Sequence, residues 1–314
     1  MRILVIASYN SNQFSPFIIE QIESLKPLGV DFEYFGIVGK GILGYFKNRE
    51  KFIRKIKEYR PDIIHAHYGL SGILANLQKG VPVVTTFHGS DIHSCKRVLF
   101  MSKIAMYLSA YNIFVGQSLF DMAKYKGKNY IIQSCGLDLS IIKPISSKTA
   151  RELLGWEQEK IYILFSGSFD NQVKNYPLAK QSVDLAGDCL LIELKGYTKE
   201  QVVLLMNACN LVIVTSFRES GPLVVKEAMA CNRPIVTTDV GDVKWVIGNT
   251  DGCYITSYDV NDCVENIKKA IQFSLEKEET NARKRIFQLR LNSEEVALKI
   301  IGTYNKILSN TRTK

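Results

Sequence analysis

Short apolar runs alternate with helix-like segments along most of the 314-residue chain, and this alternation constrains the fold more than any other feature. The first half contains RILVIA, DFEYF, DIIHAH, PVVTTF, NIFVG and YIIQS, and the second half contains KIYILFSG, CLLIEL, NLVIVT and PIVTT. Helical segments separate these runs, for example residues 176–186 and 199–208. Strands alternating with helices at this spacing predict doubly wound α/β domains, in which helices cover both faces of a parallel sheet.

One stretch interrupts the alternation and predicts a domain boundary. CGLDLSIIKPISSKTA, near residues 136–150, contains a glycine, a proline and a serine pair, as linkers often do. We therefore predict domains at residues 1–145 and 146–292, followed by a terminal helix at residues 293–314. Ligands of doubly wound sheets bind at the carboxyl ends of the strands, so we expect a cleft between the two domains.

Composition excludes several classes of protein. The chain is 46% hydrophobic and 23% charged, as expected of a globular protein without membrane spans. Its start, MRILVIASYN, predicts a buried strand rather than a signal peptide. The seven cysteines are scattered and form no C-x-x-C pair, which predicts reduced thiols rather than disulfides or a zinc site. We expect a cytoplasmic protein.

Positive charge is concentrated in the first half of the chain. Residues 1–145 hold 18 of the 40 basic and 10 of the 31 acidic residues, a net +8, which leaves 22 and 21, a net +1. Much of the excess lies in FKNREKFIRKIKEYR, residues 46–60, which is either a surface helix packed on its own domain or a helix that also meets an anionic membrane. The basic residues that would face such a membrane are Lys47, Arg49, Lys51, Arg54, Lys55 and Lys57. No motif for binding nucleic acid accompanies them.

The stretch SFRESGPLVVKEAMACNRPIVTTDVG, residues 216–241, places two glutamates eight residues apart across a Gly-Pro pair. Glu219 lies in the loop after a predicted strand, and Pro222 suits the first turn of the following helix. The free N–H groups and the dipole at that helix start form a site for an anion such as a phosphate. Glu227, inside the helix, can accept two hydroxyls, as from a ribose. Alternatively, both glutamates are ordinary cap and surface acids.

Other nucleotide-binding motifs are absent from the sequence. The first βα loop, ASYNSNQFSP, has no glycine, so the G-x-G-x-x-G fingerprint is missing and a nicotinamide enzyme is disfavoured. No G-x-x-x-x-G-K-[ST] motif and no D-x-D motif occurs either. The anion site at residues 219–223 therefore remains the main candidate for binding a nucleotide.

The pattern E-S-G-P-x-x-x-x-E-A-x-A resembles the E-x7-E motif of the GT-B glycosyltransferases, in particular the retaining glycosyltransferase family 4. The resemblance implies two Rossmann-like domains facing a cleft, the first for the acceptor and the second for the nucleotide-sugar donor, with no metal or other cofactor. It also implies that the terminal helix, VALKIIGTYNKIL, packs back on the first domain. The donor would contact the loop and helix start at Ser220, Gly221, Pro222 and Leu223.

Other stretches match the family in the same order. FSGSFDNQVKN resembles the family's glycine loop and phosphate-binding lysine, which places Gly167 and Lys174 at the diphosphate. TFHGSDI resembles the loop whose histidine, His88, faces the donor sugar. By the same resemblance Glu219 holds hydroxyls of the donor sugar and Glu227 holds the ribose. Two of these side chains also have a purely structural interpretation. Lys174 could be a solvated surface lysine, and His88 could be a loop histidine whose hydrogen bonds are satisfied within the protein.

The chain departs from the family at one position of the glycine loop, where Ser168 replaces a common arginine. The missing charge would come from elsewhere, for which Arg218 is a candidate. Tyr197 is a candidate for the pocket of the base. On the acceptor side the candidates are His67, Ser90 and Asp91. His67 also has the structural interpretation, which the sequence favours, of packing or hydrogen bonding near its strand end, and Asp91 can cap the next helix.

The resemblance implies transfer of a sugar from a nucleoside-diphosphate sugar to a glycan or lipid-linked acceptor, in the synthesis of a cell-surface polysaccharide. Lys174 and the N–H groups after Gly221 would stabilise the leaving diphosphate. Two alternatives keep the fold. The chain could be a nucleotide-sugar epimerase, or a glycosyltransferase-like partner subunit that binds without turnover, which Ser168 and the glycine-free first loop favour.

Overall fold

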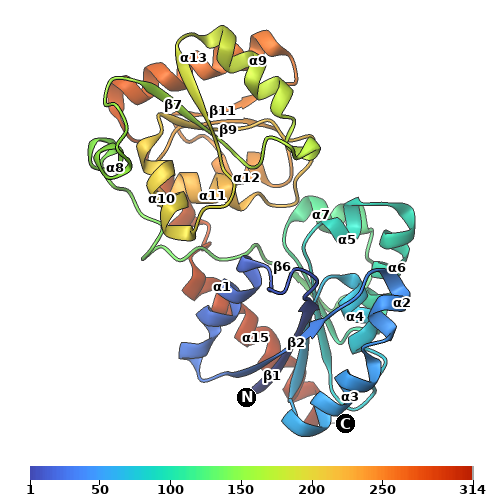
Figure 1. Ribbon diagram of the computed structural model, residues 1–314. Coiled ribbons are helices and arrows are strands. Elements are labelled where there is room, and N and C mark those ends of the chain that lie inside the picture. Colours follow the sequence, from blue (N-terminus) through green and yellow to red (C-terminus); the bar gives the residue numbers. More distant parts are fainter. Residues whose placement is uncertain (313–314) are drawn as a thin grey trace. The chain divides into compact units, whose positions relative to one another are not determined.

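The computed structural model describes residues 1–312, and Figure 1 shows its ribbon. The backbone divides into two compact units. Unit 1 comprises Met1–Gly136 and the chain from Ser293 onward, and unit 2 comprises Leu137–Asn292. Each unit contains one parallel sheet, which confirms the predicted fold class.

Unit 1 is built on a six-stranded sheet with the order β2-β1-β3-β4-β5-β6. Its elements, in chain order, are β1 (Arg2–Ser8), α1 (Pro16–Leu25), the 3-10 helix η1 (Lys26–Leu28), β2 (Asp31–Ile37), α2 (Gly41–Phe46), α3 (Arg49–Tyr59), β3 (Ile63–His67), α4 (Gly69–Ala75), β4 (Val83–Phe87), α5 (Ser90–His93), α6 (Lys96–Leu108), β5 (Tyr111–Phe114), α7 (Gln117–Ala123), β6 (Tyr130–Ile132) and α15 (Ser293–Arg312).

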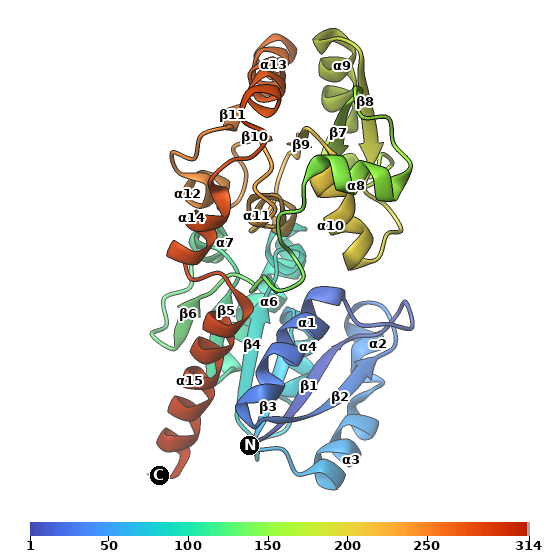
Figure 2. The same ribbon diagram turned by 90° about the vertical axis from the view of Figure 1, so that its left-hand side faces the viewer.

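Both faces of the unit 1 sheet are covered, because successive residues of its buried strands point to opposite sides. Ile3 and Val5 of β1 pack with α1 and α15, whereas Leu4 and Ile6 pack with α3 and α4. Figures 1 and 2 show α1 and α15 side by side on the first of these faces. The terminal helix thus completes the core of unit 1, to which it contributes fully buried Tyr304.

Unit 2 is built on a five-stranded parallel sheet with the order β11-β10-β9-β7-β8. Its elements, in chain order, are α8 (Ser147–Leu154), β7 (Ile161–Phe165), the 3-10 helix η2 (Gln172–Lys174), α9 (Tyr176–Ala186), β8 (Cys189–Glu193), α10 (Lys199–Ala208), β9 (Leu211–Val214), α11 (Leu223–Ala230), β10 (Ile235–Thr238), α12 (Val243–Ile247), β11 (Cys253–Thr256), α13 (Val260–Lys277) and α14 (Ala282–Gln288).

The two faces of the unit 2 sheet again have separate cores. Leu164 and Val212 pack with α10, α11 and α12, whereas Ile163 and Ile213 pack with α9 and α13. α9 and α10 begin and end at the predicted residues. The strand β11 was not predicted, because this short edge strand is only partly buried and its sequence, CYIT, shows no clear alternation.

The boundary between the units lies after residue 136, whereas the linker composition placed it at residue 145. Leu137, Leu139 and Ile142 belong to the core of unit 2, and the Leu137 N–H donates to the carbonyl of Leu291 over 2.9 Å. Apolar anchors within the linker therefore tie its first half to the second sheet. None of the described helices has the length and apolar character that crossing a membrane requires.

Candidate active site

The predicted donor residues of unit 2 gather at the carboxyl ends of β7 and β9. These neighbouring strands are the point at which the strand order reverses, since β8 lies on one side of β7 and β9, β10 and β11 lie on the other. Gly167 follows β7 closely, and Glu219 lies in the loop after β9. The crevice at such a switch point is the usual ligand site of a doubly wound sheet.

Lys174 and Glu219 form an ion pair at this switch point. The Nζ of Lys174 lies 2.7 Å from Oε1 of Glu219, and the Ser216 hydroxyl donates to the same oxygen over 2.8 Å. The two charged side chains are only 19% and 18% exposed. The Thr215 hydroxyl donates to the Lys174 carbonyl over 2.9 Å, which fixes the backbone of η2 beside β9. Two residues predicted from separate motifs are thus brought into direct contact.

Gly167 gives the aliphatic chain of Lys174 room to cross the loop, because a Cβ there would lie 3.2 Å from Lys174 Cε. Ser168, in the position where the family often has arginine, donates its hydroxyl to the carboxylates of Asp170 and Glu193. The Phe169 N–H also donates to Glu193, over 2.7 Å. Two carboxylates therefore surround Ser168, and one of them, Asp170, also pairs with Lys195 over 2.8 Å. Glu193 and Lys195 were not predicted from the sequence.

The helix start that follows Glu219 differs slightly from the prediction. α11 begins at Leu223, and Pro222 is its N-cap, with φ −62° and ψ 113°, so the proline precedes the first turn instead of occupying it. The cap supplies no side-chain hydrogen bond, which leaves the first N–H groups of the helix available to an anion. Gly241, with φ +63°, packs beneath this loop, where a Cβ would lie 2.9 Å from the Ser220 carbonyl oxygen.

Glu227 also pairs with a lysine. The Nζ of Lys199, the first residue of α10, lies 2.6 Å from Oε1 of Glu227. The Glu227 side chain is 11% exposed, and that of Lys199 is 24% exposed. The sequence did not identify Lys199, because a lysine in a first helical turn is usually solvated. Tyr197, in the loop before α10, is 44% exposed.

A third ion pair lies beneath the site. Nζ of Lys226 lies 2.7 Å from Oδ2 of Asp242, and their side chains are 0% and 5% exposed. Lys226 precedes Glu227 on α11, and Asp242 is the N-cap of α12. The pair links these two helices where they meet the loop of residues 219–222. Sequence alone could not identify it, because the adjacent acid, Glu227, lies on another side of the helix and the actual partner lies 16 positions away.

The predicted residues of unit 1 lie at the carboxyl ends of β3 and β4. His67 ends β3 and is fully buried, and its Nδ1 lies 2.9 Å from Nε2 of His88. The rings of Phe17 and Tyr68 pack on His88, with centroids 4.7 and 4.9 Å away. Burial lowers the pKa of His88 to about 3 and also lowers that of His67 well below its usual value. Both imidazoles are therefore neutral at physiological pH.

A second buried histidine connects the sheet to the terminal helix. His65 Nδ1 lies 2.6 Å from the Tyr304 hydroxyl of α15, and its Nε2 lies 2.7 Å from the hydroxyl of Thr86. Burial lowers the pKa of His65 to about 3 and raises that of Tyr304. The His65 ring stacks on His67 with centroids 4.5 Å apart. Contacts from α15 thus continue to the histidines at the strand ends.

Asp91 is a buried carboxyl group beside His88. The Gly89 N–H donates to its Oδ1 over 2.8 Å, whereas Oδ2 is buried without a hydrogen-bond partner. Burial raises the pKa of Asp91 to about 6, although bonds from nearby backbone N–H groups lower it. Ser90 is exposed at the start of α5. The structure therefore brings His67, His88 and Asp91 together, and Ser90 lies beside them in the chain.

No group of three His, Cys, Asp or Glu side chains among residues 1–312 is arranged to hold a metal ion.

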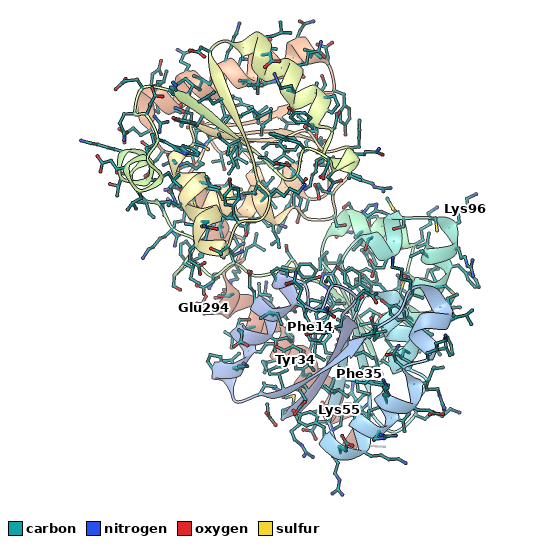
Figure 3. All side chains as sticks on the ribbon, in the orientation of Figure 1. Phe14, Tyr34, Phe35, Lys55, Lys96 and Glu294 are labelled. Carbon is teal, nitrogen blue, oxygen red and sulfur yellow. The ribbon has the colours of Figure 1, made fainter. Side chains whose placement is uncertain are left out.

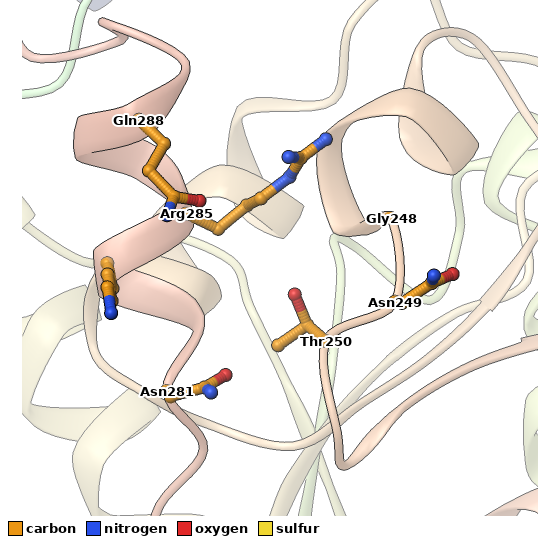
Figure 4. Close-up of a pocket in the computed structure, with 7 residues that line it drawn as sticks. Gly248, Asn249, Thr250, Asn281, Arg285 and Gln288 are labelled. Carbon is orange, nitrogen blue, oxygen red and sulfur yellow. The ribbon is translucent and has the colours of Figure 1, made fainter.

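A pocket of about 410 Å³ opens away from these residues, between α14 and the turn after α12 (Figure 4). Its Arg285 donates to the carbonyls of Val246 and Trp245, so the guanidinium caps α12. The pocket contains none of the predicted site residues.

Solved structures share the fold. Sucrose-phosphate synthase from Thermosynechococcus elongatus superposes with a TM-score of 0.83 at 16% identity, over 98% of this chain and 99% of that chain. The Anabaena protein HepE, solved in complex with UDP and glucose, superposes with a TM-score of 0.77 at 16% identity, over 98% and 100%. The two parallel sheets are those of the GT-B fold, as predicted.

Sequence relatives and family models define the protein more closely. A glycosyltransferase of Methanocaldococcus jannaschii is 28% identical over 298 residues, 86% of this chain and 79% of the relative. The D-inositol 3-phosphate glycosyltransferase of Pseudarthrobacter chlorophenolicus is 25% identical over 249 residues, and the match spans 63% of this chain and 59% of that relative. The model for Glycosyltransferase Family 4 matches residues 23–119, and that for Glycosyl transferases group 1 matches residues 147–287. The protein belongs to the group 1 and family 4 glycosyltransferases.

Proposed function

We propose that this glycosyltransferase moves a hexose-type sugar from a nucleoside-diphosphate donor to a glycan or lipid-linked acceptor, with retention of configuration, in the synthesis of a cell-surface polysaccharide. The reaction takes place on the cytoplasmic side of a membrane and needs no metal. The observation that carries the proposal is the Lys174–Glu219 pair, with its 2.7 Å contact, at the β7–β9 switch point.

Lys174 and Glu219 suit opposite ends of the donor. Without ligand their charges offset each other in a partly buried site. A diphosphate attracts the ammonium of Lys174, and the carboxylate of Glu219 is then free to accept sugar hydroxyls. The N–H groups at the start of α11 add fixed donors for the phosphate, so the charge that develops on the leaving group meets groups already in position.

Glu227 and Lys199 suit the nucleoside end of the donor. The ribose hydroxyls donate to Glu227, while Lys199 orients this carboxylate through its 2.6 Å contact. Tyr197, exposed two residues before Lys199, provides a ring for the base. Gly167 and Ser168 line the phosphates between the two ends, and Arg218 is the additional cation.

The neutral side chains of unit 1 suit the sugar and the acceptor. His88, uncharged because of its burial, offers a hydrogen bond to the donor sugar without competing for the phosphate charge. His67, Ser90 and Asp91 would face the acceptor. In the reaction, the acceptor oxygen bonds to the anomeric carbon as the bond from that carbon to the phosphate oxygen breaks. The acceptor's proton passes to the leaving phosphate on the same face, so no carboxylate nucleophile is needed.

One observation favours a second candidate, a partner subunit that binds a nucleotide sugar without turnover. Ser168 replaces a frequent arginine, and its hydroxyl is held by the carboxylates of Asp170 and Glu193. Negative charge beside the diphosphate opposes its departure. This subunit would bind nucleotides in the same way as the enzyme but release no sugar.

The test begins with thermal unfolding of the full chain in the presence of UDP, GDP, ADP and CMP. A nucleotide at 100 times its dissociation constant stabilises the protein by about 2.7 kcal/mol. We expect one nucleoside diphosphate to raise the midpoint and Glu227→Ala to abolish most of that rise. The matched control is Glu265→Ala, which removes a glutamate from an exposed pair with Lys269.

Turnover separates the two candidates. With the matching nucleotide sugar and lipid-linked or glycan acceptors, the enzyme forms a glycoside at a rate that chelation of divalent metals leaves unchanged, and Lys174→Ala lowers that rate at least about a hundredfold. Binding without turnover would support the partner subunit. If no nucleotide stabilises the native chain, both candidates are wrong.

A further inference from the structure

The outermost helices on one side of unit 1 combine exposed apolar side chains with cations. α2 and α6 flank α4, whose residues are almost all buried beneath them. In Figures 1 and 2 both helices lie on the side of the sheet opposite α1 and α15. Their outer residues, here called the α2–α6 surface, are Lys40, Leu43, Phe46, Lys47, Lys96, Arg97, Phe100, Lys103 and Tyr107.

The apolar members of this surface are exposed and lie among cations. Leu43 is 80% exposed and Phe46 is 42% exposed, and on α6 both Phe100 and Tyr107 are 63% exposed. Single exposed apolar residues are ordinary, but a group rimmed by charge marks a contact with a partner or a membrane. The positions 96, 100, 103 and 107 recur at helical spacing, so cations and aromatic rings share one stripe of α6.

The charge of this surface has one sign. The segments KGILGYFK, residues 40–47, and KRVLFMSKIAMYL, residues 96–108, contain five cations and no acidic residue. None of these cations takes part in an ion pair with another described residue, and Lys96 lies at the outer edge of unit 1 in Figure 3. The surface therefore matches an anionic partner that also offers apolar material.

The helix α3 lacks this combination. Its Phe52 is buried in the unit 1 core, and Ile56 and Tyr59 pack on the same core. It also carries Glu50 and Glu58, and its Lys55 pairs with Glu33 over 2.6 Å. α3 can thus attract an anionic surface but has no exposed apolar stripe to insert.

We propose that the α2–α6 surface binds the face of an anionic lipid membrane, with Leu43, Phe46, Phe100 and Tyr107 entering the headgroup region and the surrounding cations contacting lipid phosphates. The basic residues of α3 add attraction at a distance. Apolar burial and charge act together in such contacts, as they do for interfacial helices. Membrane binding by this surface is independent of the proposed function. Only its purpose, which is to bring unit 1 to a lipid-linked acceptor, rests on that function.

A second copy of the chain is a poorer occupant. A symmetric dimer would place the same patch against itself, and five cations would then face five cations without any acid between them. Anionic lipid offers the opposite charge together with apolar chains, so it satisfies both parts of the surface at once.

The test is sedimentation of the full chain with vesicles of phosphatidylcholine, alone or mixed with phosphatidylglycerol. We expect the native chain to bind the mixed vesicles at least about tenfold more tightly than the neutral ones. The double variant Leu43→Ser with Phe100→Ser should lose at least about tenfold of that binding, at high as well as low salt. The α3 control, Lys51→Gln with Arg54→Gln and Lys57→Gln, should lose less, and only at low salt.

Two further readouts decide the remaining outcomes. The double variant should keep the native melting temperature and the native response to nucleotide, which shows that it is folded and separates this inference from the proposed function. Vesicle binding that is unchanged in the double variant overturns the inference. Self-association of the native chain in analytical ultracentrifugation that the double variant loses would assign the surface to a second copy instead.

Discussion

The candidate residues at the strand ends of the two units differ in charge, although both sets lie on parallel sheets of the same kind. In unit 2 the carboxylates of Glu219 and Glu227 each accept a lysine ammonium within 2.7 Å. In unit 1 burial lowers the pKa of His65, His67 and His88, so these rings stay neutral, and it raises the pKa of the Asp91 carboxyl to about 6. The glutamates of unit 2 hold their charges in ion pairs, whereas the histidines of unit 1 stay uncharged.

This difference follows from whether each site provides its buried groups with a partner of opposite charge. A buried charge is stable only with a partner of opposite sign, because desolvation otherwise favours the neutral form. Unit 2 provides such partners from separate loops, so it is prepared for a charged ligand that replaces one member of a pair. Unit 1 provides neutral rings and hydroxyls, which suit a ligand of hydroxyl groups such as a sugar.

The largest expected effect comes from removing one member of the buried pair under the unit 2 site. Lys226→Ala leaves Asp242 charged and buried, which should lower the free energy of unfolding by about 3–5 kcal/mol. Lys226→Met combined with Asp242→Asn removes both charges and should recover most of that loss. Chemical denaturation of the single and double variants measures both. Equal losses in the two would mean that the charges do not interact.

The neutral histidines of unit 1 predict a smaller, pH-dependent effect. Their pKa values are lowered in the folded chain, so their contribution is complete above the unfolded value of about 6.5 and is lost as the pH falls towards about 3. Each histidine then costs about 1.4 kcal/mol per pH unit. Asp91, whose pKa is raised, acts in the opposite direction between about pH 4 and 6.

His65→Gln isolates one of these groups, because glutamine can still bond Tyr304 and Thr86 but does not titrate. The free energy of unfolding, measured from pH 5 to pH 6, should depend on pH less steeply in the variant, by about 1.4 kcal/mol per pH unit. His93→Gln, at the less buried fourth histidine, is the control. A slope unchanged by His65→Gln would show that His65 is protonated in the folded chain.

The smallest expected effect compares one carboxylate from each unit. Asp91→Asn removes a charge that burial disfavours, while the amide oxygen can still accept the Gly89 N–H, so the variant should gain about 1 kcal/mol at pH 7.5 and nothing at pH 5. Glu227→Gln removes the negative charge that lies 2.6 Å from the Lys199 ammonium and should not gain. Melting temperatures at both pH values measure the difference. If both variants melted at a higher temperature than the native chain at pH 7.5, the two units would not differ in how they stabilise a buried carboxylate.

Much of the fold could be predicted from local sequence. The strand RILVIA is apolar on both faces because helices cover both sides of its sheet, and the helices at residues 176–186 and 199–208 show their amphipathic spacing directly. The edge strand β11 was missed because a half-exposed strand lacks that spacing. The boundary was misplaced because Leu137 and Ile142 pack on distant residues that composition does not reveal.

The sequence by itself determined the alternation of strands and helices, the spacing of Glu219 and Glu227, and the lysine and glycine after β7, since these depend on residues near one another in the chain. Only the tertiary structure decided the partners. The Lys199–Glu227 and Lys226–Asp242 pairs and the His65–Tyr304 bond join residues 28, 16 and 239 positions apart. Sequence cannot predict such pairs, because the packing of the sheets, and not the local chain, sets which side chains share a buried space and whether they keep their charge.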